Sequence, residues 1–178
     1  DLLPAAHPVL IWDPTMEWAG SAADAPIANA QTFAGVRELC AAIAGGLVVR
    51  RAVIQSARAD FAAFCQLCFD AGDLTCVIDE AHIHCKQGLC PDVFLTLMRV
   101  SRHRRVNLVL IAQRPHGLAV DLRTRANTFM LFTLRASSSI EWIRNDLDPN
   151  LAAMVERLKP REYIKWPGFE TNAVSRSV

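Results

Sequence analysis

The chain has 178 residues, 52% of them hydrophobic and 21% charged, which is the composition of a globular protein with a core of its own. Its formal net charge of +1 excludes a polycation that binds nucleic acid over its whole surface, so such binding needs a local basic patch or assembly into a ring. No apolar run approaches the ~20 residues needed to span a bilayer, and no secretory signal is visible.

The first half of the chain alternates short apolar segments with amphipathic ones. In chain order these predict a strand at 7–13, a loop at 14–31, a helix at 32–46, a strand at 51–56, a helix at 58–72 and a strand at 74–79. Thr32 is the expected cap of the first helix, which should end at Gly45 and Gly46, and Gly72 should end the second helix.

The second half continues this alternation. It predicts a helix at 91–105, a strand at 107–112, a short helix at 119–126, a strand at 127–134, two helices with Ser or Asp caps within 137–158, and a last strand at 161–166. The tail from Pro167 looks polar and loose. Strands that are apolar throughout and alternate with helices indicate a mainly parallel sheet covered on both faces. Residues 1–178 are therefore expected to form a single α/β domain.

Polar residues follow three of the predicted strands. Asp13, Asp79 and Gln113 each stand at the carboxyl end of a strand, and open α/β sheets bind ligands at that edge. Glu80 follows Asp79 directly, so two carboxylates point in different directions. Such a pair suits nucleotide hydrolysis, in which one carboxylate holds the waters of Mg²⁺ and the other polarises the attacking water. The alternatives are a zinc site and a strand end at which the charges enter solvent.

Histidines and cysteines near these acids leave the zinc alternative open. Cys65 and Cys68 form a C-x-x-C pair, and further N or S ligands follow at His82, His84, Cys85 and Cys90. The pair also lies on the apolar stripe of the helix at 58–72, where thiols pack as small hydrophobic groups. With no export signal, the six cysteines are expected to be reduced. Trp12 and Trp18 either stack on a base or pack at the strand end.

The order of these motifs is similar to that of one family. An apolar strand ends in Asp-Glu-Ala-His at 79–82, and the next ends in Ala-Gln-Arg-Pro at 112–115, with basic residues between them. The chain here resembles the HerA/FtsK branch of P-loop ATPases, and further similar segments lie at 9–18, 127–143 and 158–166. Small viral genome-packaging ATPases are the most similar members, with filamentous-phage assembly ATPases as neighbours. The resemblance implies a three-layer RecA/FtsK-like core that hydrolyses ATP to translocate DNA.

The resemblance also implies roles for single residues. Asp79 would hold Mg²⁺ through a water, Glu80 would be the catalytic general base, and Gln113 would be the sensor of the nucleotide. Asp13 would belong to the nucleotide-binding residues. Arg102 occupies the place where related ring ATPases carry an arginine aimed at the neighbouring subunit's nucleotide. The alternatives for that role are Arg99, Arg104 and Arg105.

The implied assembly is a homo-oligomeric ring, a hexamer or pentamer, that binds ATP and double-stranded DNA. Virion-vertex or membrane proteins are further implied partners, and the implied location is the host cytoplasm or the virion. We expect DNA contacts from Lys86 in the loop after the acids and from Arg123 and Arg125 in the short helix, because a ring multiplies a few basic residues around one axis.

One motif of the family is absent from the sequence. Such ATPases hold phosphates with G-x-x-x-x-G-K-[ST], and no Gly is followed by Lys in this chain. In the family, this loop precedes the strand that is predicted here at 7–13. We therefore expect that the N-terminal phosphate-binding segment lies upstream and is missing from this chain, which would then bind nucleotide poorly. The alternative is a degenerate, non-catalytic assembly factor.

Overall fold

The computed structural model describes residues 7–18, 30–56, 58–86, 88–166 and 174–176. These residues form two compact units, Asp1–Gln113 (unit 1) and Arg114–Val178 (unit 2), within the span for which the sequence predicted a single domain. Among the described residues, no helix has the length and apolar character that crossing a membrane requires.

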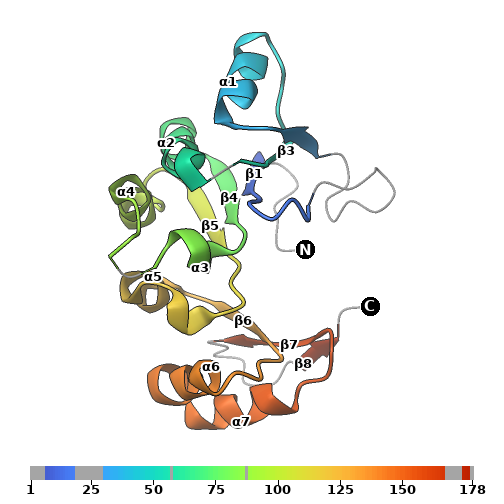
Figure 1. Ribbon diagram of the computed structural model, residues 1–178, viewed down its shortest axis with the longest axis vertical. Helices are drawn as coiled ribbons and strands as arrows, with labels where there is room; N and C mark the ends of the chain where they lie inside the picture. The colour runs from blue at the N-terminus through green and yellow to red at the C-terminus, as the bar shows by residue number, and fades with distance from the viewer. Residues whose placement is uncertain (1–6, 19–29, 57, 87, 167–173, 177–178) are drawn as a thin grey trace. The chain divides into compact units, whose positions relative to one another are not determined.

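Unit 1 is built on a five-stranded sheet in which paired strands run parallel, as predicted (Figure 1). The strand order is β2-β3-β1-β4-β5, and the strands are β1 (Val9–Trp12), β2 (Gln31–Phe33), β3 (Arg51–Ile54), β4 (Leu74–Ile78) and β5 (Val106–Leu110). Every residue of the neighbouring strands β1 and β4 is buried, as expected for strands covered on both faces. Their register pairs Trp12 with Ile78, so the chain leaves both strands at the same level.

Helices cover the face of this sheet that carries the side chain of Trp12. The helices of unit 1 are α1 (Val36–Ala44), α2 (Phe61–Ala71), α3 (Ala81–His84) and α4 (Asp92–Val100), and a 3₁₀ turn at Arg58–Asp60 precedes α2. The indole of Trp12 contacts Phe61 and Phe64 of α2 at centroid distances of 5.4 and 5.3 Å, and Phe61 contacts Phe94 of α4 at 5.8 Å. Because strand side chains alternate between faces, Val9, Ile11, Val53 and Val77 form a second cluster, against which Trp18 packs.

The predicted helix ends in unit 1 are partly confirmed. Thr32 does not cap α1 but lies in β2, a three-residue strand too short to show an alternating pattern. The backbone N–H of Ala34 instead donates to the carboxylate of Glu38 at 2.6 Å. Gly72 ends α2 as predicted: its φ is 60°, and a Cβ there would lie 3.0 Å from the carbonyl oxygen of Arg104.

Unit 2 combines a small antiparallel sheet with helices. Its strands are β6 (Phe129–Phe132), β7 (Glu162–Trp166) and β8 (Val174–Arg176), and β8 falls in the tail that was expected to be loose. Its helices are α5 (Val120–Arg125), α6 (Ser137–Trp142) and α7 (Pro149–Arg157), with a 3₁₀ turn at Pro115–Gly117 and a π-helix at Ile143–Leu147. Asp148 caps α7 by accepting from the N–H groups of Asn150 and Leu151, whereas no serine side chain caps α6.

The core of unit 2 lies between its sheet and the helical segment that follows β6. Its buried members come from β6, α6, the π-helix, α7 and β7, and they are Leu131, Ile140, Trp142, Ile143, Leu151, Ala152, Val155, Leu158 and Ile164. The predicted strand–helix–helix–strand order of this region is therefore confirmed, although the strand pairing is antiparallel.

Candidate functional site

The carboxyl ends of the central strands of unit 1 gather the polar residues that the sequence singled out. Asp13 follows β1, and Asp79 and Glu80 follow β4. The backbone pairing between β4 and β5 continues past both strands, because Ile111 N–H donates to the carbonyl of Ile78 at 2.9 Å and Ala81 N–H donates to that of Ile111 at 2.8 Å. Gln113 is therefore held beside Glu80, and the predicted meeting of these residues at one edge of the sheet is observed.

Asp13 is fully buried, with 0% exposure, and both of its carboxylate oxygens are used inside the protein. Oδ1 accepts from the hydroxyl of Thr15 and the N–H of Glu17, both at 3.2 Å. Oδ2 accepts from the N–H of Trp18 at 3.0 Å and from Nε2 of Gln55 at 3.2 Å. Asp13 thus shapes the turn at 13–18, and this geometry does not support the direct nucleotide contact that the sequence suggested.

The turn that Asp13 shapes reaches across to the acid on the neighbouring strand. Met16, inside the turn, has a φ of 62°, in the left-handed region that non-glycine residues seldom adopt. The indole Nε1 of Trp18 donates to Oδ2 of Asp79 at 2.7 Å. Trp18 is therefore attached at two points, with its backbone on Asp13 and its side chain on Asp79. Base stacking is not needed to explain either tryptophan, since Trp12 is completely buried.

Glu80 occupies a strained position at the start of α3. Its φ of 46° and ψ of 40° place a non-glycine residue in the left-handed region, which is rare outside sites with a special requirement. Nε2 of Gln113 donates a short hydrogen bond to Oε1 of Glu80. Nδ1 of His82 lies 3.0 Å from Oε2, an ion-pair distance without the angle of a hydrogen bond. Both carboxylate oxygens thus have a polar neighbour, although the side chain keeps 13% exposure.

Asp79 has the properties of a ligand for magnesium-bound water. It is 6% exposed, and among the residues that the structure describes, its Oδ1 accepts no hydrogen bond while Oδ2 is used by Trp18. Magnesium prefers oxygen ligands and usually keeps several waters, so one carboxylate together with substrate phosphates suffices to hold it. The residues present therefore fit a magnesium–nucleotide site at Asp79.

The zinc alternative is not supported. Among the described residues, no group of three or more His, Cys, Asp or Glu side chains is arranged to hold a metal ion. His84 lies in α3 rather than in a loop, is 2% exposed, accepts from Nε1 of Trp12 at 3.0 Å and stacks on Phe61. Burial is the first cause that raises the pKa of the Cys65 and Cys68 thiols above their usual range. For Cys85, a hydrogen bond with Cys90 raises the pKa first, and burial adds to it.

The arginines before β5 have different environments. Arg104 donates to the carbonyls of Phe69 and Asp70 at 2.9 and 2.7 Å, so it caps the end of α2. Arg105 pairs with Asp73 at 2.9 Å. Arg102 is exposed, and its side chain makes no hydrogen bond or ion pair with any described residue. Of these three arginines, Arg102 is the one available to a partner.

Arg102 also lies at the opposite end of β5 from the acids. All of β5 lies between Arg102 and Gln113 in the chain, and its five residues span roughly 16 Å at about 3.3 Å per residue. Arg102 therefore lies too far from the carboxyl edge of its own sheet to act on these acids.

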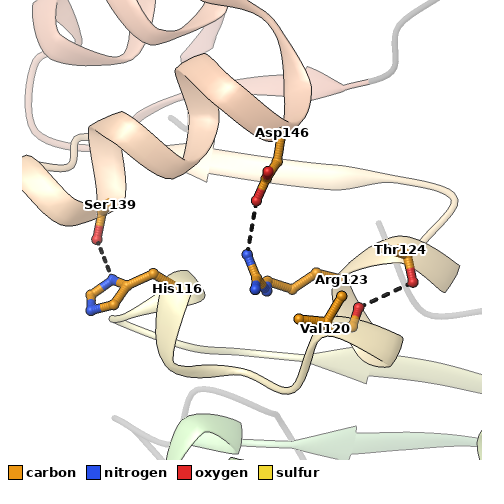
Figure 2. Close-up of polar contacts among 6 residues, drawn as sticks. All are labelled: His116, Val120, Arg123, Thr124, Ser139 and Asp146. Atoms are coloured by element: carbon orange, nitrogen blue, oxygen red, sulfur yellow. Dashed lines mark hydrogen bonds and ion pairs between the residues drawn. The ribbon is translucent and has the colours of Figure 1, made fainter. Parts of the chain in front are cut away.

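The three residues expected to contact DNA also differ in how far their side chains are used inside the protein. Figure 2 shows Arg123 pointing from α5 to Asp146, which it contacts at 3.1 Å, and its guanidinium also lies 5.5 Å from the ring centroid of Trp142. With 15% exposure, Arg123 stabilises unit 2, and the prediction that it contacts DNA is not supported by its placement. Lys86 and Arg125 are exposed and remain available.

Three residues near the acids make contacts that the sequence did not predict. Gln55 directly follows β3, so the rule that singled out Asp13 and Asp79 would also have found it. Trp18 and His82 stand five residues after Asp13 and two after Glu80, but only the turn geometry brings their side chains onto carboxylates.

A scan against protein-family models and a search of curated proteins gave no match. Solved structures do match. The genome packaging NTPase B204 from Sulfolobus turreted icosahedral virus 2 in complex with AMPPCP has a TM-score of 0.70 and 18% sequence identity, over 90% of this chain and 76% of that chain. Its complex with ATP-gammaS gives the same values: a TM-score of 0.70, 18% identity, and 90% and 76% coverage.

A second virus supplies a similar structure. B204, the DNA-packaging ATPase from Sulfolobus Turreted Icosahedral Virus, has a TM-score of 0.67 and 21% identity, over 90% of this chain and 77% of that chain. The chain therefore has the fold of these packaging NTPases, and the predicted α/β fold class with its mainly parallel sheet is confirmed. The structural neighbours are viral genome-packaging NTPases, the group that the sequence resembled.

Proposed function

We propose that this chain is part of an ATPase that drives the packaging of a viral DNA genome and that hydrolyses ATP at the carboxyl edge of unit 1. The observation that carries the proposal is the placement of Glu80, which directly follows Asp79 and accepts a hydrogen bond from Gln113 at the end of the neighbouring strand. The fold supports it, since the neighbours named above are packaging NTPases that bind ATP analogues.

Each acid has its own task in this proposal. Asp79 holds the magnesium ion through a water, and the ion, when bound, neutralises the phosphate oxygens. Glu80 takes the proton of the attacking water, and the amide of Gln113 fixes the carboxylate without changing its charge. A general base contributes typically 10²–10⁴-fold to a rate, so the loss of this one carboxylate is measurable.

The phosphate cradle comes from another segment in this proposal, because no Gly-Lys pair exists in the sequence. A strand is still free to pair beside the site: β5 is the last strand of its sheet, and among the described residues it is paired on one side only. A segment that adds next to β5 would bring its loop to the edge where Glu80 and Gln113 lie.

The proposed assembly is a ring on double-stranded DNA. The exposed Arg102, which cannot reach its own acids, would stabilise phosphate charge in the neighbouring subunit's site. Lys86 and Arg125 are the proposed DNA contacts, because both are exposed and available. Phosphate contacts of this kind weaken with salt, so DNA binding should fall steeply as ionic strength rises.

The test is Glu80→Gln in the full-length protein, with Glu156→Gln as the control, since Glu156 is an exposed glutamate on α7. The Glu80 variant should bind ATP as the wild type does while phosphate release falls by about 10²-fold or more, and the control should keep both properties. Wild-type turnover in the Glu80 variant contradicts the catalytic role. A wild-type protein that neither binds nor hydrolyses ATP would instead indicate the degenerate assembly factor.

A further inference from the structure

The indole of Trp18 makes a contact that the proposed catalytic roles leave unexplained. Its Nε1 donates to Oδ2 of Asp79 at 2.7 Å, which is short for an N–H···O bond and typical of a charged acceptor. Asp79 is 6% exposed, so solvent does little to fix its carboxylate. A donor that occupies one oxygen determines the rotation of the carboxylate and thus the direction in which the other oxygen points.

The indole is itself held in place from two sides. The N–H of Trp18 donates to Oδ2 of Asp13 at 3.0 Å, and Asp13 is fully buried and bound by Gln55 as well. The ring packs against the apolar cluster of the sheet that contains Val9 and Val77. A rigid donor that is fixed by a buried acid and a packed ring is a preorganised support rather than a surface side chain that happens to lie nearby.

We propose that Trp18 is a positioning residue for Asp79: it binds Oδ2, keeps that oxygen away from the metal, and directs Oδ1 towards the water of a magnesium–nucleotide complex. This inference rests on the proposed function, because it assigns the magnesium role to Asp79. It adds a residue outside the acid pair, since the turn at 13–18 becomes part of the metal site through one indole N–H.

The inference predicts a selective effect on metal binding. Hydrogen-bond partners of metal-bound ligands typically contribute 10–100-fold to metal affinity or activity, and because Asp79 holds the metal through a water we expect an effect at the lower end of that range. Phenylalanine keeps most of the ring packing and lacks the N–H, so Trp18→Phe should raise the Mg²⁺ concentration for half-maximal ATPase activity by about tenfold. Activity at saturating Mg²⁺ should fall much less, because Glu80 and Gln113 are unchanged.

The matched control is Trp166→Phe, which removes another half-buried indole, in β7 of unit 2. Both variants are compared with the wild type in the full-length protein, by titrating Mg²⁺ at fixed ATP. Unfolding by urea, followed in parallel, should show similar stability for the two variants, which excludes a general loss of structure as the cause.

A second readout does not depend on turnover. In the ¹H–¹⁵N spectrum, the indole resonance of Trp18 is assigned by its loss in Trp18→Phe, and its exchange with solvent is measured. We expect slow exchange in the wild type and fast exchange in Asp79→Ala, because the acceptor is gone. Addition of Mg²⁺ with a non-hydrolysable ATP analogue should shift this resonance and leave that of Trp166 in place.

The outcomes separate the two proposals. A wild-type protein that hydrolyses ATP, with the same Mg²⁺ dependence in Trp18→Phe as in Trp166→Phe, overturns the positioning role and leaves the proposed function intact. A wild-type protein without hydrolysis overturns the proposed function, and the Asp79-dependent protection of the indole then still decides whether the bond exists. Equal indole exchange in wild type and Asp79→Ala overturns the inference in either case.

Discussion

Replacement of the buried Asp13 by alanine should destabilise unit 1 substantially. The carboxylate accepts four hydrogen bonds. Two come from the exposed residues Thr15 and Glu17, whose donors can hydrogen-bond to water instead, and two come from the half-buried Trp18 and Gln55. Each donor left buried without a partner costs about 1–3 kcal/mol, which gives about 2–6 kcal/mol for the pair; because both residues are half-buried, we expect about 3 kcal/mol, in the lower half of that range. Asp13→Asn should cost less, because one oxygen remains as an acceptor.

Hydrogen exchange followed by mass spectrometry can measure this loss in unit 1 alone. Peptides from β1 and β4 report the stability of the central strands. Since about 1.4 kcal/mol corresponds to a factor of ten, a loss of about 3 kcal/mol predicts about 100-fold faster exchange there. Asp92→Ala, at an exposed acid in the first turn of α4, is the control and should change exchange less than tenfold. If Asp13→Ala exchanges no faster than this control, the hydrogen-bond reasoning is wrong.

Three further predictions concern arginines and thiols. In mixed rings, Arg102→Ala should reduce ATPase activity more than dilution does, and by about 10³-fold in an all-mutant ring, whereas Arg37→Ala, at an exposed arginine on α1, should not; strictly proportional loss contradicts the trans role. Arg123→Ala should destabilise unit 2 by about 1–2 kcal/mol in urea, mainly through lost stacking on an aromatic ring, because its ion pair is with a 55% exposed acid. Arg125→Ala should leave that stability unchanged and weaken DNA binding at low salt; the reverse pattern refutes both assignments. A thiol reagent at pH 8 should modify the exposed Cys40 in the native protein. The buried thiols of Cys65, Cys68 and Cys85 should react only after denaturation, because their raised pKa keeps them protonated. Rapid modification of these three thiols in the native protein contradicts their burial.

The parts of the fold that the sequence predicted are those in which burial alone determines the pattern. The segments around β1 and β4 are apolar without alternation because both faces of these strands are covered, and this feature depends on no distant contact. Short elements carry too few residues for a periodic signal. For this reason the sequence predicts neither β2, with three residues, nor α3, with four, and it predicts a helix cap at Thr32, which lies in β2.

The candidate site was predicted as a set of strand ends but not as a set of contacts. Parallel strands that end together place Asp79, Glu80 and Gln113 at one edge, so their proximity follows from chain order. The predicted roles of Asp13 and Arg123 assume exposed side chains, which is usual for an acid after a strand and for a basic residue on a short helix, whereas the structure uses both side chains inside the protein. Their burial depends on partners that the sequence separates from them, namely the turn up to Trp18 and, for Arg123, Asp146.

The left-handed backbone at Glu80 has an evolutionary consequence. An L-residue in that conformation costs about 1–2 kcal/mol, which glycine would not incur and asparagine would partly avoid. A lineage that no longer needs the carboxylate would therefore gain stability by drifting to Gly or Asn at this position, and the exchange would require no repacking of the sheet. Among homologous genes, the identity of this one residue should thus mark which copies still require the Glu80 carboxylate.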